Sequence, residues 1–474
     1  MLLLLLASLA YLYYRSRALS HVPGPWLSRF TSLTLKYHEF RGRRREYIHA
    51  LHRWYGPAVR LAPNEASFTS LEAVKEVYAA GGSGYDKTEY YSLFCQFGIR
   101  TMFSTLNKEE HRRRKRILAE RYTMTNVMRE PLLEGIQERA RAFTAKCANS
   151  VGSVDIYALL HCYALDCVTH FLFGDGLDSL CLPANYEIMA EMTYHQSLQK
   201  NLLHYYLPRI APYLPFCQPR HAPLANEYVI GAMKKKVDQE ASSKTQQHES
   251  YSLIDRLLSS MEGMPAAAEC KDHMAAGIDT TGDALCFAIW QLSKEKHSHV
   301  QTKLKEELRE HYRSDQAGDL RSLDRLPYLD AVIKETLRLT PPIPMSLPRY
   351  APGGKGKSNV VIDGYAIPAG TIVSSQAYSV HRLNQDVFPE SDRFTPDRWL
   401  GDALDQNRLF FAFGQGSRGC TGRNLATMEM KILLAEVYLR FSTINENEDQ
   451  MDMELDDQII SARPRGQMCK VVFT

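Results

Sequence analysis

The strongest constraint on how this chain can fold is a glycine-rich loop that leads directly into a helix-forming stretch. Residues 413–422 read Phe-Gly-Gln-Gly-Ser-Arg-Gly-Cys-Thr-Gly, and a helical pattern begins at Arg423. Four glycines in ten residues permit tight, partly left-handed turns and the close approach of a flat object. The loop therefore predicts a tight turn that presents Cys420 at the N-terminus of a helix.

The position of Cys420 favours an ionised sulfur, because the helix macrodipole and its free N–H groups stabilise a thiolate. A thiolate held in this way is a soft axial ligand for haem iron. Arg418, two residues earlier, can point toward an anionic haem propionate. For a glycine-rich loop taken alone, a buried structural cysteine is the favoured alternative.

A second motif, Glu335-Thr336-Leu337-Arg338, places an acid and a base three residues apart. On a helix these side chains share one face and can form a buried, bidentate ion pair. The pattern is weak by itself, because surface Glu/Arg pairs at this spacing are common.

A third motif, residues 276–281, reads Ala-Gly-Ile-Asp-Thr-Thr in a helical context. Asp279 and Thr280 place an acid and a hydroxyl at one turn, which suits them to relaying protons. Gly277 is costly inside a helix, and beside the small Ala276 it predicts a place where a flat ligand approaches the backbone. A packed core helix, with the threonine bonded back to the preceding turn, is the favoured alternative for this segment taken alone.

Together these motifs resemble the cytochrome P-450 family of haem-thiolate monooxygenases. The cysteine loop of that family reads Phe-Gly-x-Gly-x-Arg-x-Cys-x-Gly, and every fixed position of it is present in residues 413–422. Its oxygen-activating motif, Ala/Gly-Gly-x-Asp/Glu-Thr-Thr/Ser, matches residues 276–281 throughout. The resemblance spans essentially the whole chain and implies the cytochrome P-450 fold: mainly α with small β-sheets, in a single large haem-binding domain.

The resemblance also implies roles for individual residues. Cys420 is the ligand of the haem iron, Thr280 donates a hydrogen bond to the dioxygen that the haem activates, and Asp279 supports proton delivery. Glu335, Arg338 and Arg398 form a structural triad behind the haem, although Asp397 and Trp399 stand where the family pattern has Glu and Phe. The remaining residues implied to bind the cofactor, haem b, are Arg418, Phe413, Gly414, Gly422, Arg349, His111 and Lys115.

The composition excludes some other classes of protein. Lys and Arg total 57 against 54 Asp and Glu, so the chain lacks the positive excess typical of a nucleic-acid binder, and no nucleic-acid partner is expected. The ten cysteines contain no CxxC pair, which argues against a structural zinc site and a disulfide framework. Short strands are expected in residues 57–69, 359–375 and the C-terminal MCKVVFT, and mostly helices in residues 105–340.

The N-terminus, MLLLLLASLAYLYY, is apolar and is followed by Arg15 and Arg17. We expect a short membrane anchor over residues 1–14, a basic and Pro-Gly-Pro linker over residues 15–25, and a catalytic domain over residues 26–474. Basic residues after the apolar run favour keeping the domain in the cytosol, at the endoplasmic reticulum membrane. A cleaved signal peptide ending at Ser8-Leu9-Ala10 is the alternative.

Three other features leave alternatives open. The proline-rich segment 203–224 is either an apolar loop at a membrane surface that guards a substrate entrance or a connection buried against the core. The basic run 112–116 is either a solvated helix face or a docking patch for an acidic redox partner. By analogy with the family, substrate contacts are expected in Ser83–Thr105, Met274–Thr281, Ile343–Leu347 and Ser461–Ala462, which are mainly apolar.

The function that this resemblance implies is a monooxygenase that activates O2 and oxidises an apolar small molecule, in fungal secondary metabolism by default. Because the chain carries no flavin or iron–sulfur segment, NADPH–cytochrome reductase is the expected electron donor. A haem-thiolate isomerase or dehydratase that needs no reductase is one alternative, and the Asp279-Thr280 pair argues against it. A non-catalytic haem-binding module is the other.

Overall fold

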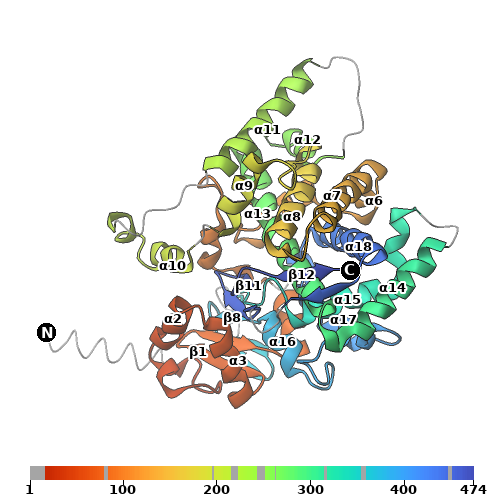
Figure 1. The fold of residues 1–474 in the computed structure, drawn as a ribbon. Coiled ribbons are helices and arrows are strands. Elements are labelled where there is room, and N and C mark those ends of the chain that lie inside the picture. Colours follow the sequence, from red (N-terminus) through yellow and green to blue (C-terminus); the bar gives the residue numbers. More distant parts are fainter. Residues whose placement is uncertain are drawn as a thin grey trace.

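The computed structural model describes residues 17–79, 84–194, 197–214, 223–242, 251–261, 263–313, 318–353, 359–446 and 451–474. The expected anchor, residues 1–14, lies outside these ranges. Helices dominate the described chain and the strands form small sheets, so the expected class, mainly α with minor β, is confirmed (Figure 1). The α-helices are α2 (Leu33–Phe40), α3 (Arg44–Tyr55), α4 (Leu71–Val74), α5 (Lys108–Leu118), α6 (Met124–Val127), α7 (Glu130–Ala148), α8 (Ile156–Phe173), α9 (Pro183–Tyr194), α10 (Leu198–Tyr206), α11 (Pro223–Ser242), α12 (Leu253–Leu258), α13 (Met264–Leu292), α14 (Ser298–Arg313), α15 (Pro327–Leu339), α16 (Ala377–Leu383), α17 (Leu404–Leu409) and α18 (Arg423–Arg440).

Short strands and single helical turns connect these helices. The strands are β1 (Ala58–Ala62), β2 (Glu65–Phe68), β3 (Asp86–Lys87), β4 (Ser153–Asp155), β5 (Arg349–Tyr350), β6 (Val360–Ile362), β7 (Tyr365–Ile367), β8 (Ile372–Ser374), β9 (Thr443–Asn445), β10 (Leu455–Asp457), β11 (Ala462–Pro464) and β12 (Lys470–Phe473). The short helical turns include η1 (Trp26–Arg29), η2 (Lys75–Ala79), η3 (Glu89–Phe94), η4 (Ala211–Tyr213), η6 (Glu295–His297), η7 (Leu320–Arg325), η8 (Pro396–Trp399) and η9 (Gly416–Arg418).

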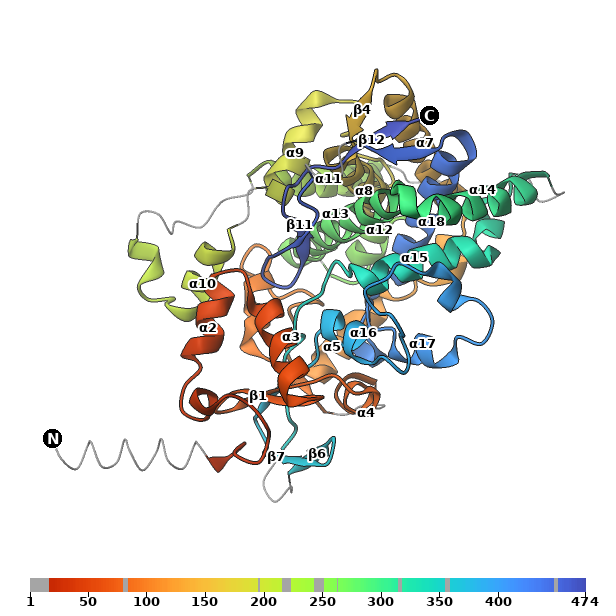
Figure 2. The ribbon, with the colours of Figure 1, turned by 60° about the horizontal axis from the view of Figure 1, so that its bottom comes forward.

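The largest sheet has the strand order β1-β2-β8-β5-β3 and lies to one side of the helical body (Figure 2). The strands expected in residues 57–69 are β1 and β2, which pair antiparallel. Residues 359–375 form the expected hairpin in β6 and β7, but the next strand, β8, joins the large sheet parallel to β2. The C-terminal β12 pairs with β4 and β9, so the expected last strand is confirmed.

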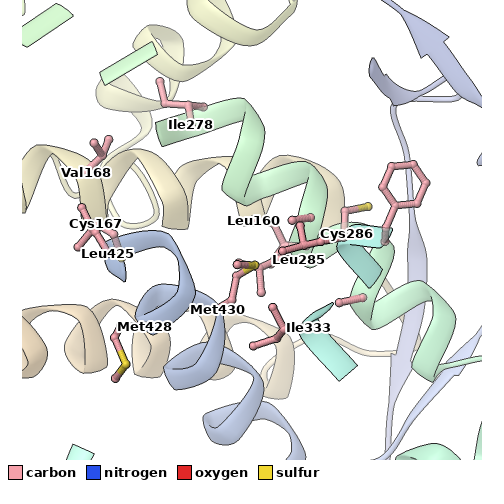
Figure 3. Close-up of a cluster of buried hydrophobic side chains, with 14 of the residues drawn as sticks. Leu160, Cys167, Val168, Ile278, Leu285, Cys286, Ile333, Leu425, Met428 and Met430 are labelled. Carbon is pink, nitrogen blue, oxygen red and sulfur yellow. The ribbon is translucent and has the colours of Figure 1, made fainter. Parts of the chain in front are cut away.

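The core is built around α8 and α13, which pack against each other along their length (Figure 3). Helix α8 is apolar on nearly all sides, the pattern of a helix surrounded by protein. It is the one helix in the described ranges that is long and apolar enough to cross a membrane, but 89% of that stretch is buried inside the fold. Helix α8 is therefore a core helix, and it ends at Gly174 in the left-handed conformation at φ 87°.

Glycines on α13 permit this close packing. A Cβ atom on Gly277 would lie 2.7 Å from Val168 Cγ2 of α8, and one on Gly282 would lie 2.9 Å from the His161 ring. Figure 3 shows Val168 and Ile278 where the two helices meet. Both glycines are thus required, because α8 and α13 lie too close together for a side chain at either position.

The folded body begins before the boundary expected at Trp26. Leu19 and Val22 are already buried in the core. The buried guanidinium of Arg60 on β1 donates hydrogen bonds to the carbonyl oxygens of Leu19, Val22, Gly24 and Pro25, at 2.5–3.1 Å. The described part of the linker is therefore fastened to the large sheet, and the boundary that we expected was too late.

Candidate active site

The loop that carries Cys420 is held by its own backbone and by a neighbouring helical turn. The Cys420 N–H donates to Phe413 O at 2.8 Å, and the Gly414 N–H donates to Phe411 O at 3.0 Å. Gly414 and Gly416 have φ of 64° and 65°. A Cβ atom on Gly416 would lie 2.1 Å from Tyr78 O of η2, so only glycine fits there.

The environment of Cys420 has two opposing effects on its ionisation. Burial raises the pKa of the thiol, whereas hydrogen bonds from the N–H groups of Gly422 and Arg423 and the charge of Lys115 lower it. The side chain nevertheless keeps accessible surface. Cys420 thus lies inside the fold with donors behind its sulfur and one open side, as a ligand to a metal requires. In the free thiol, burial raises the pKa of Cys420 by more than the N-terminus of the helix lowers it. The sequence prediction did not include this effect of burial.

The residues of the 276–281 motif lie on different sides of helix α13. Ala276 is exposed although the helix around it is largely buried, and Thr280 follows one turn later. The Thr280 hydroxyl donates to Ala276 O at 2.6 Å, the back-bonding considered as the alternative for this segment. Gly277 contacts α8 instead of this open face, so the prediction that Gly277 admits a flat ligand was wrong. Ala276 forms the open surface.

Asp279 lies within a polar group of buried side chains that comes from α8, α9 and α13. Its Oδ1 accepts a hydrogen bond from Thr193 Oγ1 of α9 at 2.9 Å. Burial raises the pKa of Asp279 to about 6. A carboxyl with this pKa both gains and loses a proton readily near neutral pH.

A cluster of buried and half-buried basic side chains lies beside the cysteine loop. It contains His111, Lys115, Arg349 and Arg418, all of which the sequence singled out, and also Lys87. Arg418 donates to Thr105 O at 3.0 Å and Leu106 O at 2.6 Å, and Lys115 donates to Ser417 O at 2.9 Å. Arg349 donates to Tyr91 Oη at 2.6 Å.

The cations of this cluster repel one another. Burial, followed by the charges of Arg418, Lys87, Lys115 and Arg349, lowers the pKa of His111 to about 3. Burial and Arg349 lower the pKa of Arg418 to about 10, although Asp86 raises it. Lys87 of β3 pairs directly with Arg349 of β5, and like charges opposite each other destabilise a sheet. The arrangement favours an anionic group between these side chains.

A buried ion-pair cluster lies next to the loop. Arg338 donates from Nε and Nη2 to the two oxygens of Glu335, at 2.8 and 2.9 Å, and Arg398 Nε donates to Oε1 at 3.0 Å. The indole N–H of Trp399 donates to Oε2 at 2.9 Å. The structure thus brings Glu335, Arg338 and Arg398 together as expected.

His381 connects this cluster to the cysteine loop. Its Nδ1 is 3.1 Å from Arg338 O, and its Nε2 accepts the backbone N–H of Phe411 at 2.8 Å. Burial, followed by the charge of Arg338, lowers the pKa of His381 to about 3, so the ring is neutral and can donate from one nitrogen while it accepts at the other.

Comparison with known proteins agrees with this geometry. A sequence profile of the family described as Cytochrome P450 matches residues 22–471. The chain belongs to the cytochrome P450 family. It is 30% identical to "Cytochrome P450 monooxygenase orf2" of Aspergillus niger, over 97% of this chain and 94% of that protein. It is 28% identical to "Cytochrome P450 monooxygenase stcB" of Emericella nidulans, over 96% and 89%, and 30% identical to "Cytochrome P450 monooxygenase ORF9" of Penicillium roqueforti, over 93% and 84%.

This cytochrome P450 is a monooxygenase, and the residues present fit the haem that its family implies. Cys420 offers a sulfur ligand with one open side, and the cluster of basic side chains offers donors for two carboxylates. The exposed methyl of Ala276 on α13 offers a small apolar surface on which a flat macrocycle can lie. Cys420 would bind the iron, and Lys87, His111, Lys115, Arg349 and Arg418 would face the propionates.

Two residues of this P450 site were missed from the sequence. Lys87 was included only within the substrate-contact segment Ser83–Thr105, because its role depends on the pairing of β3 with β5 across more than 250 residues. Trp399 was treated as a mild departure from the family pattern, and its indole N–H in fact binds Glu335. A lone lysine among the aromatic residues of 85–94 was the signal that could have found Lys87.

The structure also brings together parts of the expected substrate-contact segments. A cavity of about 410 Å³ is lined by Tyr90, Met345 and Ser346, with Ile459 and the neighbouring Tyr205 and Tyr206. Ser83 lies outside the described residues. The basic run is divided: Arg114 pairs with the buried Glu269 at 3.1 Å, whereas Arg112, Arg113 and Arg116 are exposed.

Proposed function

We propose that this P450 binds haem b through Cys420 and oxidises an apolar small molecule in fungal secondary metabolism, with electrons that pass from NADPH through a separate reductase. The arrangement of Cys420 carries the proposal, because backbone donors stand behind the sulfur while its other side is open. The fungal origin of the relatives supports the metabolic context.

Each residue of the site has a defined part in this reaction. When bound, the haem supplies the iron centre at which dioxygen is reduced, and a thiolate ligand favours cleavage of the O–O bond. The N–H groups of Gly422 and Arg423 stabilise the negative charge on Cys420. Thr280, once it releases Ala276 O, can donate from the open face of α13, and Asp279 holds the proton that replaces the one donated.

The first experiment tests the ligand. The reduced, carbon-monoxide-bound protein is expected to absorb at the position typical of thiolate ligation. Cys420→Ser should abolish that absorption, whereas Cys181→Ser, at an exposed position, should leave it unchanged. A Cys420→Ser protein that keeps the thiolate absorption would refute the assignment.

The second experiment tests the reaction. Product should form only with NADPH and an added reductase, and Thr280→Ala should divert the electrons into peroxide or water. If product instead forms from a peroxide without reductase, and Thr280→Ala changes nothing, the protein is an isomerase or dehydratase. If it binds haem but consumes no NADPH under any condition, it is a non-catalytic module.

We further propose that the protein is held at the endoplasmic reticulum membrane with its catalytic domain facing the cytosol. Exposed apolar side chains on η1 and α2 support this: Trp26 and Leu33 are 68% and 69% exposed. Beyond α10, which contacts α2, Ile210 and Tyr213 are 53% and 85% exposed. The described part of segment 203–224 therefore presents apolar surface, which argues against the fully buried connection.

Cell fractionation with protease protection tests this placement. The protein should sediment with microsomes, and a protease added outside them should digest the catalytic domain. A soluble protein, or a domain protected until the microsomes are opened, would contradict it. Deletion of the gene in its host, followed by product analysis, tests the proposed metabolic role through the loss of one metabolite and the accumulation of a less oxidised precursor.

The exposed arginines of α5 are the proposed contact for an acidic reductase surface. Arg112, Arg113 and Arg116 project outward from the helix whose Lys115 binds the cysteine loop. Arg113→Glu should weaken electron transfer and reduce its dependence on salt, because long-range attraction between surface charges is screened by ions. Arg309→Glu on α14 is the control, and an equal effect of both would contradict this docking surface.

A further inference from the structure

Helix α13 carries a second carboxylate one turn beyond Asp279. Asp283 follows at i+4, so the two side chains lie on one face of the helix. Asp283 is 2% exposed and faces His161 of α8, which is fully buried, with 3.5 Å between His161 Nε2 and Asp283 Oδ1. Moving a charged group out of water costs several kcal/mol per ion. The presence of a buried charge pair at this place therefore calls for an explanation.

The backbone of α13 leaves space for this pair. Gly282, which has no side chain, lets the His161 ring approach α13, since a Cβ atom there would lie 2.9 Å from the ring. His161 Nδ1 is 2.8 Å from Tyr157 O, and because only a protonated nitrogen can donate to a carbonyl, this contact directs Nε2 toward Asp283.

The pair belongs to the same buried group as Asp279. Asp279 accepts from Thr193 Oγ1, and Arg463 of β11 donates to Thr193 O at 2.8 Å. The other titratable groups facing the pair are Tyr157 and Cys286, and burial raises the pKa of both, so they stay protonated. Arg463 is therefore the remaining charge near the three groups.

The charges of the pair act on Asp279 in opposite directions. Burial has the largest effect on the pKa of Asp279 and raises it. The charge of His161 has the next largest effect and lowers this pKa, whereas Asp283 raises it by less. Asp283 in turn raises the pKa of His161, against the effect of burial. The intact ion pair thus favours loss of the proton from Asp279.

We propose that the His161–Asp283 pair is a positioning element of the proton supply, which sets the readiness of Asp279 to release its proton. The proposal rests on the proposed function for the role of Asp279. It assigns His161 and Asp283 no contact with substrate or cofactor. The two residues act as one unit, since either, left alone in this buried place, gives up its charge.

Because His161 and Asp283 act as one unit, the loss of either residue should have the same effect on Asp279. Asp283→Asn and His161→Gln should each raise the midpoint at which Asp279 titrates, by about half a pH unit or more, because the lowering influence of His161 disappears in both. The double variant should raise it no further. His170→Gln, a buried histidine of the same helix with backbone partners at Gly174 and Pro131, is the matched control and should leave it unchanged.

Infrared spectra of the resting haem-loaded protein measure this midpoint without turnover. The carbonyl stretch of a protonated, buried carboxyl is followed over roughly pH 4 to 9, and Asp279→Asn identifies the band that belongs to Asp279. With reductase present, the pH at which the yield of product per NADPH falls by half should move upward by the same amount. Asp283→Ser, smaller than Asp283→Asn, provides a second variant if the first does not retain the thiolate absorption.

The outcomes distinguish a failure of the His161–Asp283 proposal from a failure of the proposed function. Equal upward shifts in the single and double variants support the pair. Opposite shifts, additive shifts, no shift, or an equal shift in His170→Gln would overturn it. Failure of the proposed function would appear differently, as an absence of reductase-dependent product in the unaltered protein, while the infrared titration would still decide whether the pair controls Asp279.

Discussion

Trp399 offers a sharp test of the site architecture, because changing it to phenylalanine restores the family pattern and should nevertheless weaken the protein. Its indole N–H donates to Glu335 Oε2 at 2.9 Å, in a cluster where Glu335 and Arg338 are fully buried. Trp399→Phe leaves Glu335 Oε2 with Arg338 Nε as its partner, at 2.8 Å.

The expected loss has two parts. A hydrogen bond to a charged group contributes about 1.5–3 kcal/mol. The missing ring adds about 1 kcal/mol where Trp399 packs against Phe388 and Phe410, with ring centroids 5.8 and 5.3 Å apart. We therefore expect the free energy of unfolding to fall by about 2.5–4 kcal/mol.

Trp290→Phe is the matched control, because Trp290 Nε1 is buried and has no hydrogen-bond partner among the described residues. Urea titration of the haem-loaded proteins, followed by circular dichroism and by the thiolate absorption, compares the two. The Trp399→Phe midpoint should fall further than that of Trp290→Phe. Equal shifts would show that the bond to Glu335 adds nothing and would refute the reasoning.

Three other substitutions test separate parts of the structure. Gly416→Ala should prevent haem incorporation, since its Cβ would lie 2.1 Å from Tyr78 O, whereas Gly401→Ala, at φ 73° with no atom within 4 Å, should only lower the melting temperature slightly. Lys87→Met should speed haem transfer to apomyoglobin while the haem-free protein becomes no less stable to urea, because it removes a repelled cation. Burial raises the pKa of Glu429 from 4.5 to about 8, so the unfolded chain ionises first and stability falls as the pH rises between these values. Glu429→Gln should remove that slope and stabilise the protein by about 3 kcal/mol at pH 7 in urea titrations.

Local patterns were sufficient to predict much of this site. The cysteine loop, the 276–281 motif and the Glu335–Arg338 pair are each contained in ten residues or fewer, and their backbone conformation follows from glycine freedom and helical spacing. For the same reason the strands β1, β2 and β12 and the helical body were found, because period and turn residues are local signals.

What the sequence could not supply is the direction in which a residue faces once helices pack. Helix α13 is buried on most sides, so its amphipathic pattern does not distinguish the side that meets α8 from the side that stays open. The cost of Gly277 was correctly taken to need a reason, but the reason is Val168 of α8 and not a ligand. Lys87 and Trp399 were missed because their partners, Arg349 and Glu335, are distant in sequence.

The same packing explains the location of the residues in the proposed proton supply. Helix α8 is apolar around most of its surface, and Gly282 of α13, which has no side chain, leaves room there for the ring of His161. Asp283 then falls one helical turn from Asp279, so a contact between two core helices acts directly on the acid of the oxygen-activating motif. A substitution that loosens α8 against α13 near Gly282 should therefore alter the pH dependence of turnover before it alters haem binding, since Cys420 and its donors belong to a different contact, between the cysteine loop and α18.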